Sequence, residues 1–79
     1  MDYYLLVRDL GNLEVKTRSI ETGERLIDWF LKKCSAYDHY SRLHYLTGII
    51  MKAGCLVDRY QPEEAIRLVE EYFAIAKNR

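Results

Sequence analysis

The chain has 79 residues, 49% of them hydrophobic and 30% charged, and its twelve basic side chains balance its twelve acidic ones. This length allows one domain at most, and the apolar content argues against intrinsic disorder. A net charge of zero provides no long-range field to attract nucleic acid or an anionic membrane, and it weakens the repulsion between copies of the chain.

The sequence also bears on the cellular compartment. Charged residues interrupt every apolar segment that could span a membrane, and the N-terminus lacks the basic and apolar regions of a secretory signal. The only cysteines, Cys34 and Cys55, lie in apolar helical patterns, so we expect buried free thiols instead of a disulfide. These features predict a cytoplasmic, reducing location.

Residues 3–18 are typical of a β-hairpin, because two apolar, extended-looking runs flank a Gly11-Asn12 turn. A three-residue loop pairs Glu14 with Arg8, whereas a two-residue loop would place Glu14 opposite Asp9. We therefore expect the longer loop. It turns one face of the hairpin inward, namely Tyr3, Leu5, Val7, Leu13 and Val15. The other face includes Tyr4 and Leu6, and an edge of such a ribbon needs cover from the helices or from another chain.

Residues 24–34 predict an amphipathic helix after a crossing segment in which Ser19 or Thr22 provides the cap. Its apolar side chains recur at spacings of three and four and predict a buried stripe of Leu26, Ile27, Phe30, Leu31 and Cys34.

The segment from Tyr40 to Tyr60 predicts a long central helix that supplies the middle of the core. Its apolar stripe consists of Leu43, Leu46, Ile50, Ala53, Val57 and Tyr60. In the alternative, Gly54 ends this helix and residues 55–57 form a third strand, but the stripe continues in phase through Gly54 and favours the helix. Gly48 and Gly54 also permit close approach of another backbone.

Pro62, followed by two acidic residues, predicts the start of the last helix. The expected buried stripe is Ala65, Ile66, Val69, Tyr72, Phe73 and Ala76. The complete prediction is a single α+β domain over residues 1–79, with a two-stranded antiparallel hairpin packed on three helices in the order β-β-α-α-α.

No pattern in the sequence predicts catalysis, a metal or a cofactor. His39 and His44 are five residues apart, and a helix splays such positions by about 140°, whereas helical metal ligands are three or four apart. Neither cysteine shows the polarised setting of a nucleophile, and no glycine-rich phosphate loop occurs. We therefore expect no enzymatic activity from the chain alone, although one sequence leaves open an enzyme subunit that completes another chain's active site.

The unusual feature of the composition is its seven tyrosines. Tyrosine, histidine and arginine favour binding surfaces, and they predict a candidate partner-binding set of Tyr37, His39, Tyr40, Arg42, His44 and Tyr45, extended by Tyr4 and Leu6 of the hairpin. The tyrosines are more typical of a core boundary with wet hydroxyl groups than of a binding patch.

The functional hypothesis is a small non-enzymatic protein-interaction module. We expect it to be homodimeric and to regulate or inhibit a protein partner. A chain of this size without a signal or catalytic motif also fits a regulator or inhibitor encoded by a phage or a mobile element. The alternative is a nucleic-acid-binding regulator that uses the basic and aromatic residues of segment 32–45, with the rings stacked on single-stranded bases.

Overall fold

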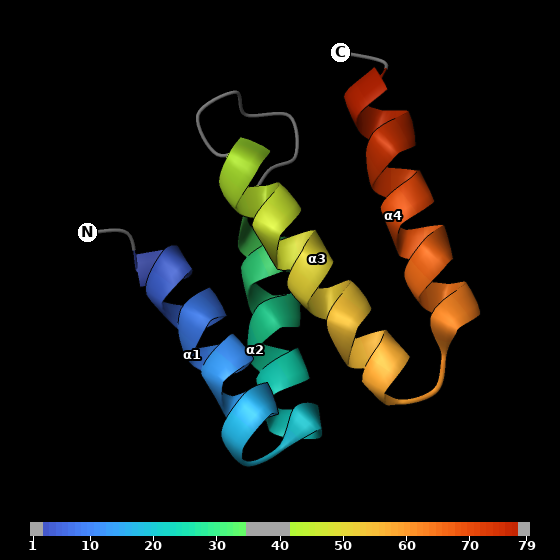
Figure 1. Ribbon diagram of the computed structural model, residues 1–79. Helices are drawn as coiled ribbons and strands as arrows, with labels where there is room; N and C mark the ends of the chain where they lie inside the picture. Colours follow the sequence, from blue (N-terminus) through green and yellow to red (C-terminus); the bar gives the residue numbers. More distant parts are fainter. Residues whose placement is uncertain (1–2, 35–41, 78–79) are drawn as a thin grey trace.

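The computed structural model describes residues 3–34 and 42–77, which form four helices (Figure 1). The helices are α1 (Tyr3–Thr17), α2 (Ile20–Lys33), α3 (Arg42–Asp58) and α4 (Pro62–Lys77). The predicted α+β fold is therefore wrong: one helix replaces the hairpin, and the described part of the chain contains no strand.

The turn predicted at Gly11-Asn12 lies in the middle of α1. Gly11 packs against Gly23 of α2, and a Cβ atom added at Gly11 would lie 2.8 Å from the Gly23 carbonyl oxygen. The glycine therefore permits two helix backbones to touch and does not reverse the chain. The N–H groups of Arg18 and Ser19 both donate to the Glu14 carbonyl, each at 2.8 Å, and end the helix.

The helix α2 begins at Ile20, one turn earlier than predicted. Ser19 is its N-cap, because its side-chain oxygen accepts a hydrogen bond of 3.1 Å from the Thr22 backbone N–H. The prediction of Ser19 as a cap is confirmed. At the other end the Cys34 N–H donates to the Phe30 carbonyl at 2.9 Å.

The helix α3 continues through Gly54, so the prediction of one helix is confirmed and the alternative third strand is absent. It ends at Asp58, short of the predicted end at Tyr60. Tyr60 has a left-handed backbone with φ 62° and belongs to the turn into α4. There the Gln61 N–H donates to the Leu56 carbonyl at 2.8 Å. Pro62 is the first residue of α4, as predicted.

The four helices form a flat molecule with extents of 37, 34 and 14 Å. The helix α2 contacts both α1 and α3, whereas α4 packs against α3 and contacts none of the other described helices (Figure 1). The buried hydrophobic side chains come from α2, α3 and α4 and are Ile27, Phe30, Ile49, Cys55, Ala65 and Tyr72.

The stripe predicted to be the middle of the core lies largely on the surface. Leu43, Ile50 and Val57 are each more than half exposed, and Tyr60 is 93% exposed. The opposite side of α3 faces α2, because Gly48 allows a close approach: an added Cβ atom there would lie 2.7 Å from a Phe30 ring carbon. The prediction identified residues that share one face of α3 but placed that face wrongly in the interior.

Candidate protein-binding surface

The structure divides the predicted cluster at the start of the central helix. Tyr37, His39 and Tyr40 lie outside the described residues. The other three, Arg42, His44 and Tyr45, occupy the first turn of α3 and are half-buried. The Tyr45 ring stacks on the buried Tyr72 ring of α4, with centroids 5.9 Å apart and planes at 25°. Tyr45 therefore fits the core-boundary interpretation.

Tyr4 and Leu6, predicted on the outer face of a hairpin, are instead on α1 and are each 40% exposed. The Tyr4 ring lies 5.5 Å from the Trp29 ring of α2. The helix α1 reaches the start of α3 through another residue, since Arg8 donates to the His44 carbonyl at 3.2 Å. Leu6 belongs to a stripe turned away from Gly11, and hence from α2, together with Leu10 and Leu13.

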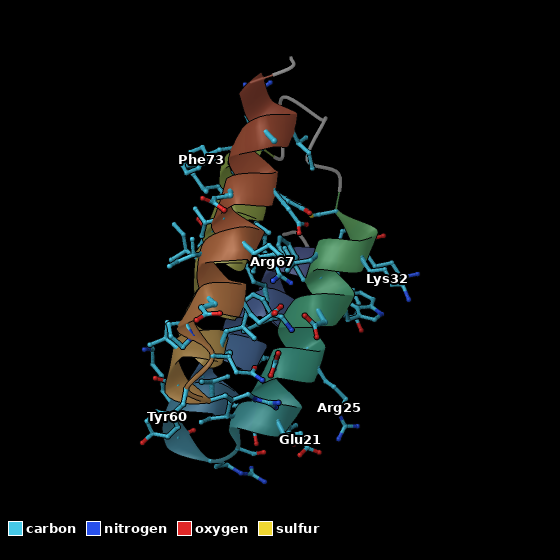
Figure 2. All side chains as sticks on the ribbon, turned by 90° about the vertical axis from the view of Figure 1, so that its right-hand side faces the viewer. Glu21, Arg25, Lys32, Tyr60, Arg67 and Phe73 are labelled. Atoms are coloured by element: carbon cyan, nitrogen blue, oxygen red, sulfur yellow. The ribbon has the colours of Figure 1, made fainter. Side chains whose placement is uncertain are left out.

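A larger apolar surface lies on α3 and α4, which we call the apolar face. It consists of five side chains that are each more than half exposed: Leu43, Ile50 and Val57 from α3, and Ile66 and Phe73 from α4. Figure 2 shows Phe73 on one side of the molecule and Arg25 and Lys32 of α2 on the opposite side. Phe73 and these basic side chains of α2 therefore lie on opposite sides of the molecule.

A groove of about 400 Å³ lies between α3 and α4 at this face. Its walls are almost entirely apolar, with one carboxylate from Glu70 at the margin; the other lining residues are Ala53, Ala65, Ile66, Val69 and Phe73. A groove of this chemistry accepts aliphatic or aromatic side chains from another helix.

The apolar face could have been suspected from the sequence of α4. Its apolar positions form two adjacent rows, one with Ala65 and Tyr72 and the other with Ile66 and Phe73. Only the first row is buried, because α3 is the only described helix that α4 contacts. The sequence signal of this face is an apolar stripe on α4 that is wider than one neighbouring helix can cover.

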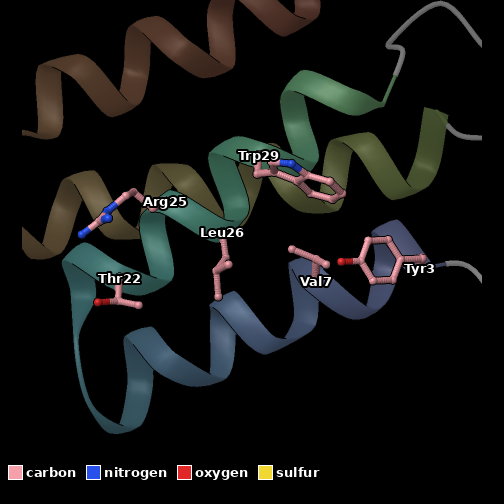
Figure 3. A pocket seen from close by; sticks show the side chains of 6 residues that line it. All are labelled: Tyr3, Val7, Thr22, Arg25, Leu26 and Trp29. Atoms are coloured by element: carbon pink, nitrogen blue, oxygen red, sulfur yellow. The ribbon is translucent and has the colours of Figure 1, made fainter.

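A second hollow of about 400 Å³ lies between α1 and α2 (Figure 3). The rings of Tyr3 and Trp29 stand at 90° with centroids 5.8 Å apart at one end of this hollow, and Thr22 and Arg25 lie at the other. The cationic Nζ of Lys33 lies 5.9 Å from the centre of the Trp29 ring. The aromatic end of this hollow is therefore already in contact with a cationic side chain of the same protein.

Four charged side chains join α2 to α3. Lys52 forms an ion pair with Glu24 and lies 2.9 Å from an Asp28 carboxylate oxygen, while Arg59 Nη2 lies 2.8 Å from the other Glu24 oxygen. Burial alone lowers the pKa of Lys52, but the hydrogen bonds that its ammonium group donates to Glu24 and Asp28 raise the pKa above its usual value. Glu24 is 8% exposed and has a cation at each oxygen. The cluster therefore has the arrangement of a structural ion pair and not of a proton-transfer site.

Within residues 3–34 and 42–77, no three histidine, cysteine or acidic side chains gather where they could hold a metal ion. None of the helices in those two ranges has both the length and the apolar content to cross a bilayer. Comparisons with protein-family models, with curated proteins and with solved structures found no match to this chain.

Proposed function

We propose that this chain is a non-enzymatic protein-interaction module that binds a protein partner at the apolar face of α3 and α4. The supporting observation is an imbalance between exposed and buried hydrophobic groups. Among the described residues, eleven large hydrophobic side chains are exposed, whereas six hydrophobic side chains are buried. Exposed apolar surface that is gathered into one patch marks an interaction site more often than scattered surface does.

The size of the apolar face suits this role. Its five side chains expose on the order of 500 Å² of apolar area, and a standard protein interface buries about 800 Å² on each partner. The surrounding groove and rim can supply the difference. Ile66 and Phe73 line the groove and are the anchors, because large apolar side chains that fill or flank an apolar pocket contribute most to binding.

The partner's complementary element is an amphipathic helix that places apolar side chains into the groove between α3 and α4. By occupying that element, the module would regulate or inhibit its partner. Cys55 is a buried thiol, which suits a reducing compartment, and we propose a cytoplasmic location for the module.

Affinity capture from the native host tests the proposal. The wild-type chain is compared with Phe73→Ser, which removes an anchor, and with Arg67→Ser, which changes an exposed residue on another side of α4. We expect one protein to be captured by the wild type and by Arg67→Ser and to be lost with Phe73→Ser.

The captured complex should also survive high salt, because its contacts are apolar, whereas a complex with nucleic acid would weaken steeply. Equal capture by Phe73→Ser, or loss of the complex in salt, would contradict the proposed function.

A further inference from the structure

The hollow between α1 and α2 has the size of a small-molecule site. Six residues of these two helices line it, namely Tyr3, Val7, Thr22, Arg25, Leu26 and Trp29 (Figure 3). Its volume of about 400 Å³ lies within the range of roughly 300–1,000 Å³ that ligand pockets occupy. We call it the α1–α2 hollow. The apolar face is built on the other two helices, so the two surfaces are separate.

The floor of the hollow is apolar and is held in place by the contact between the two helix backbones. Val7 and Leu26 lie in its middle (Figure 3). Leu26 follows Gly23 by three residues and Val7 precedes Gly11 by four, so each is one turn from the place where the two glycines touch. A Cβ atom added at Gly11 would lie 2.9 Å from the Leu26 Cβ atom. The floor therefore exists before a ligand binds, and such preorganisation lowers the cost of binding.

One end of the hollow presents two aromatic rings at right angles. The centroids of the Tyr3 and Trp29 rings are 5.8 Å apart, and their planes stand at 90°. Tyr3 is 65% exposed, so its ring surface is accessible from the hollow. Aromatic side chains in this arrangement can pack against a third ring through an edge or an offset face. This end of the hollow therefore favours a flat aromatic group.

The other end presents a cation and a hydroxyl group. Arg25 is the only charged residue among the described residues that line the hollow. Its ion pair with Glu21 is 3.7 Å long, and both side chains are about three-quarters exposed, so the pair is weak. The Arg25 guanidinium is therefore available to a carboxylate, which it can bind through two parallel hydrogen bonds. Thr22 lies three residues earlier on the same side of α2, and its hydroxyl group can donate another hydrogen bond.

The charges around the hollow select an anion. Arg25, Trp29 and Lys33 follow one another at intervals of four residues and share one side of α2. The Lys33 Nζ atom lies 5.9 Å from the centre of the Trp29 ring. A cationic ligand would meet a like charge near both ends of the hollow, whereas a negatively charged ligand meets opposite charges there.

We propose that the α1–α2 hollow binds a small aromatic carboxylate. The carboxylate group accepts hydrogen bonds from Arg25 and Thr22, and the ring lies on the apolar floor against Trp29. Arg25 and Trp29 are about 6 Å apart along α2, which suits an acid whose charge is attached directly to a flat ring system. This site is additional to the proposed function, because the protein partner binds to the other pair of helices.

Two-dimensional amide NMR spectra of the full chain test the proposal, with 2-naphthoate as the probe. Trp29 is the only tryptophan, so its indole N–H group gives a single resonance that reports on the hollow. We expect this resonance and the Leu26 amide resonance to shift and to saturate with a dissociation constant on the order of 0.1–1 mM. Two comparison compounds should each bind about fivefold more weakly: 2-naphthylmethanol has the same rings without the charge, and octanoate has the charge without a ring.

Arg25→Gln is the decisive variant, because it removes the charge and leaves the apolar floor intact. Arg25 is exposed, so the variant should keep the fold, which circular dichroism checks. We expect it to bind 2-naphthoate about fivefold more weakly than the wild type does. The matched control is Arg67→Gln, since Arg67 is also exposed and paired with a glutamate of its own helix but lies on α4. This control should leave the dissociation constant unchanged.

Several results would overturn the proposal. They are a Trp29 resonance that does not move, equal binding of either comparison compound, and an unchanged dissociation constant for Arg25→Gln. Shifts confined to Ile66 and Phe73 would place the probe at the apolar face and would overturn it as well. None of these results bears on the proposed function, because the capture experiment depends on Phe73 and not on the α1–α2 hollow.

Discussion

Replacing Gly23 by alanine tests the closest helix contact in the molecule. The added methyl group would collide with the Gly11 carbonyl oxygen and would lie 2.7 Å from the Val15 backbone nitrogen, both in α1. These are main-chain atoms, so no side-chain rotation can relieve the clash. The helices α1 and α2 must move apart, and the side chains around Gly23 then lose packing contacts.

The size of the effect follows from two opposing terms. Extra volume in a well-packed interior costs about 1–3 kcal/mol, and contact with backbone atoms places this site at the upper end. The better helix propensity of alanine offsets about 1 kcal/mol. A net loss of about 2 kcal/mol follows, which is a large part of the roughly 4–12 kcal/mol that a chain of this length has. The melting temperature should fall by about 8–16 °C.

Thermal and urea unfolding followed by circular dichroism measure this loss, and Gly54→Ala is the matched control. The same substitution at Gly54 meets open space, so it should stabilise the monomer by about 1 kcal/mol. Both variants are measured at concentrations low enough that the transition does not depend on concentration. A Gly23→Ala protein as stable as the wild type would show that α1 and α2 are not in backbone contact.

Two further predictions concern titratable groups. Burial alone lowers the pKa of Lys52, but its carboxylate partners raise the pKa above 10.5. The contribution of Lys52 to the free energy of unfolding is therefore complete below about pH 10.5 and is lost as pH rises through the folded-state pKa. Lys52→Met should lower the free energy of unfolding by about 2 kcal/mol at neutral pH. In urea titrations at alkaline pH, the stability of this variant should converge on that of the wild type, and a difference that stays constant with pH would contradict the ion pair. Cys55 is 1% exposed, and burial raises the pKa of its thiol. Iodoacetamide near pH 8 should therefore label Cys34 first and Cys55 only on unfolding. Equal labelling of the two residues by mass spectrometry would contradict this packing.

Local signals in the sequence predicted several features correctly. The Ser19 cap, the Pro62 helix start and the continuity of α3 through Gly54 each depend on residues within a few positions of one another. Such signals act through the backbone of a single segment, so the rest of the fold has little influence on them.

The hairpin prediction failed because the N-terminal segment fits two periods. Tyr3, Leu5 and Val7 alternate as in a strand, while Leu6, Leu10 and Leu13 recur as on a helix. Gly11 beside Asn12 resembles a turn, and its true role depends on Gly23, which packs against it in another helix. A contact between helices is not visible in the local pattern, so the sequence alone favoured the wrong structure.

The binding surface was obscured for a related reason, because a stripe shows which residues share a face and not what covers that face. Both sides of α3 are apolar, with Ile49 on the side that is buried and Ile50 on the side that is exposed. Hydrophobicity therefore does not decide which side of α3 turns toward α2. Interactions of other kinds must do so.

Charge pairing, together with the close approach at Gly48, determines which side of α3 faces α2. Glu24 is buried on α2, and a buried carboxylate without a cation is strongly unfavourable. Lys52 supplies that cation only if its side of α3 faces α2. Because Ile50 and Val57 lie on the other side of α3, satisfying Glu24 turns these two side chains outward. The exposed apolar side of α3 thus follows from the ion pair in the interior.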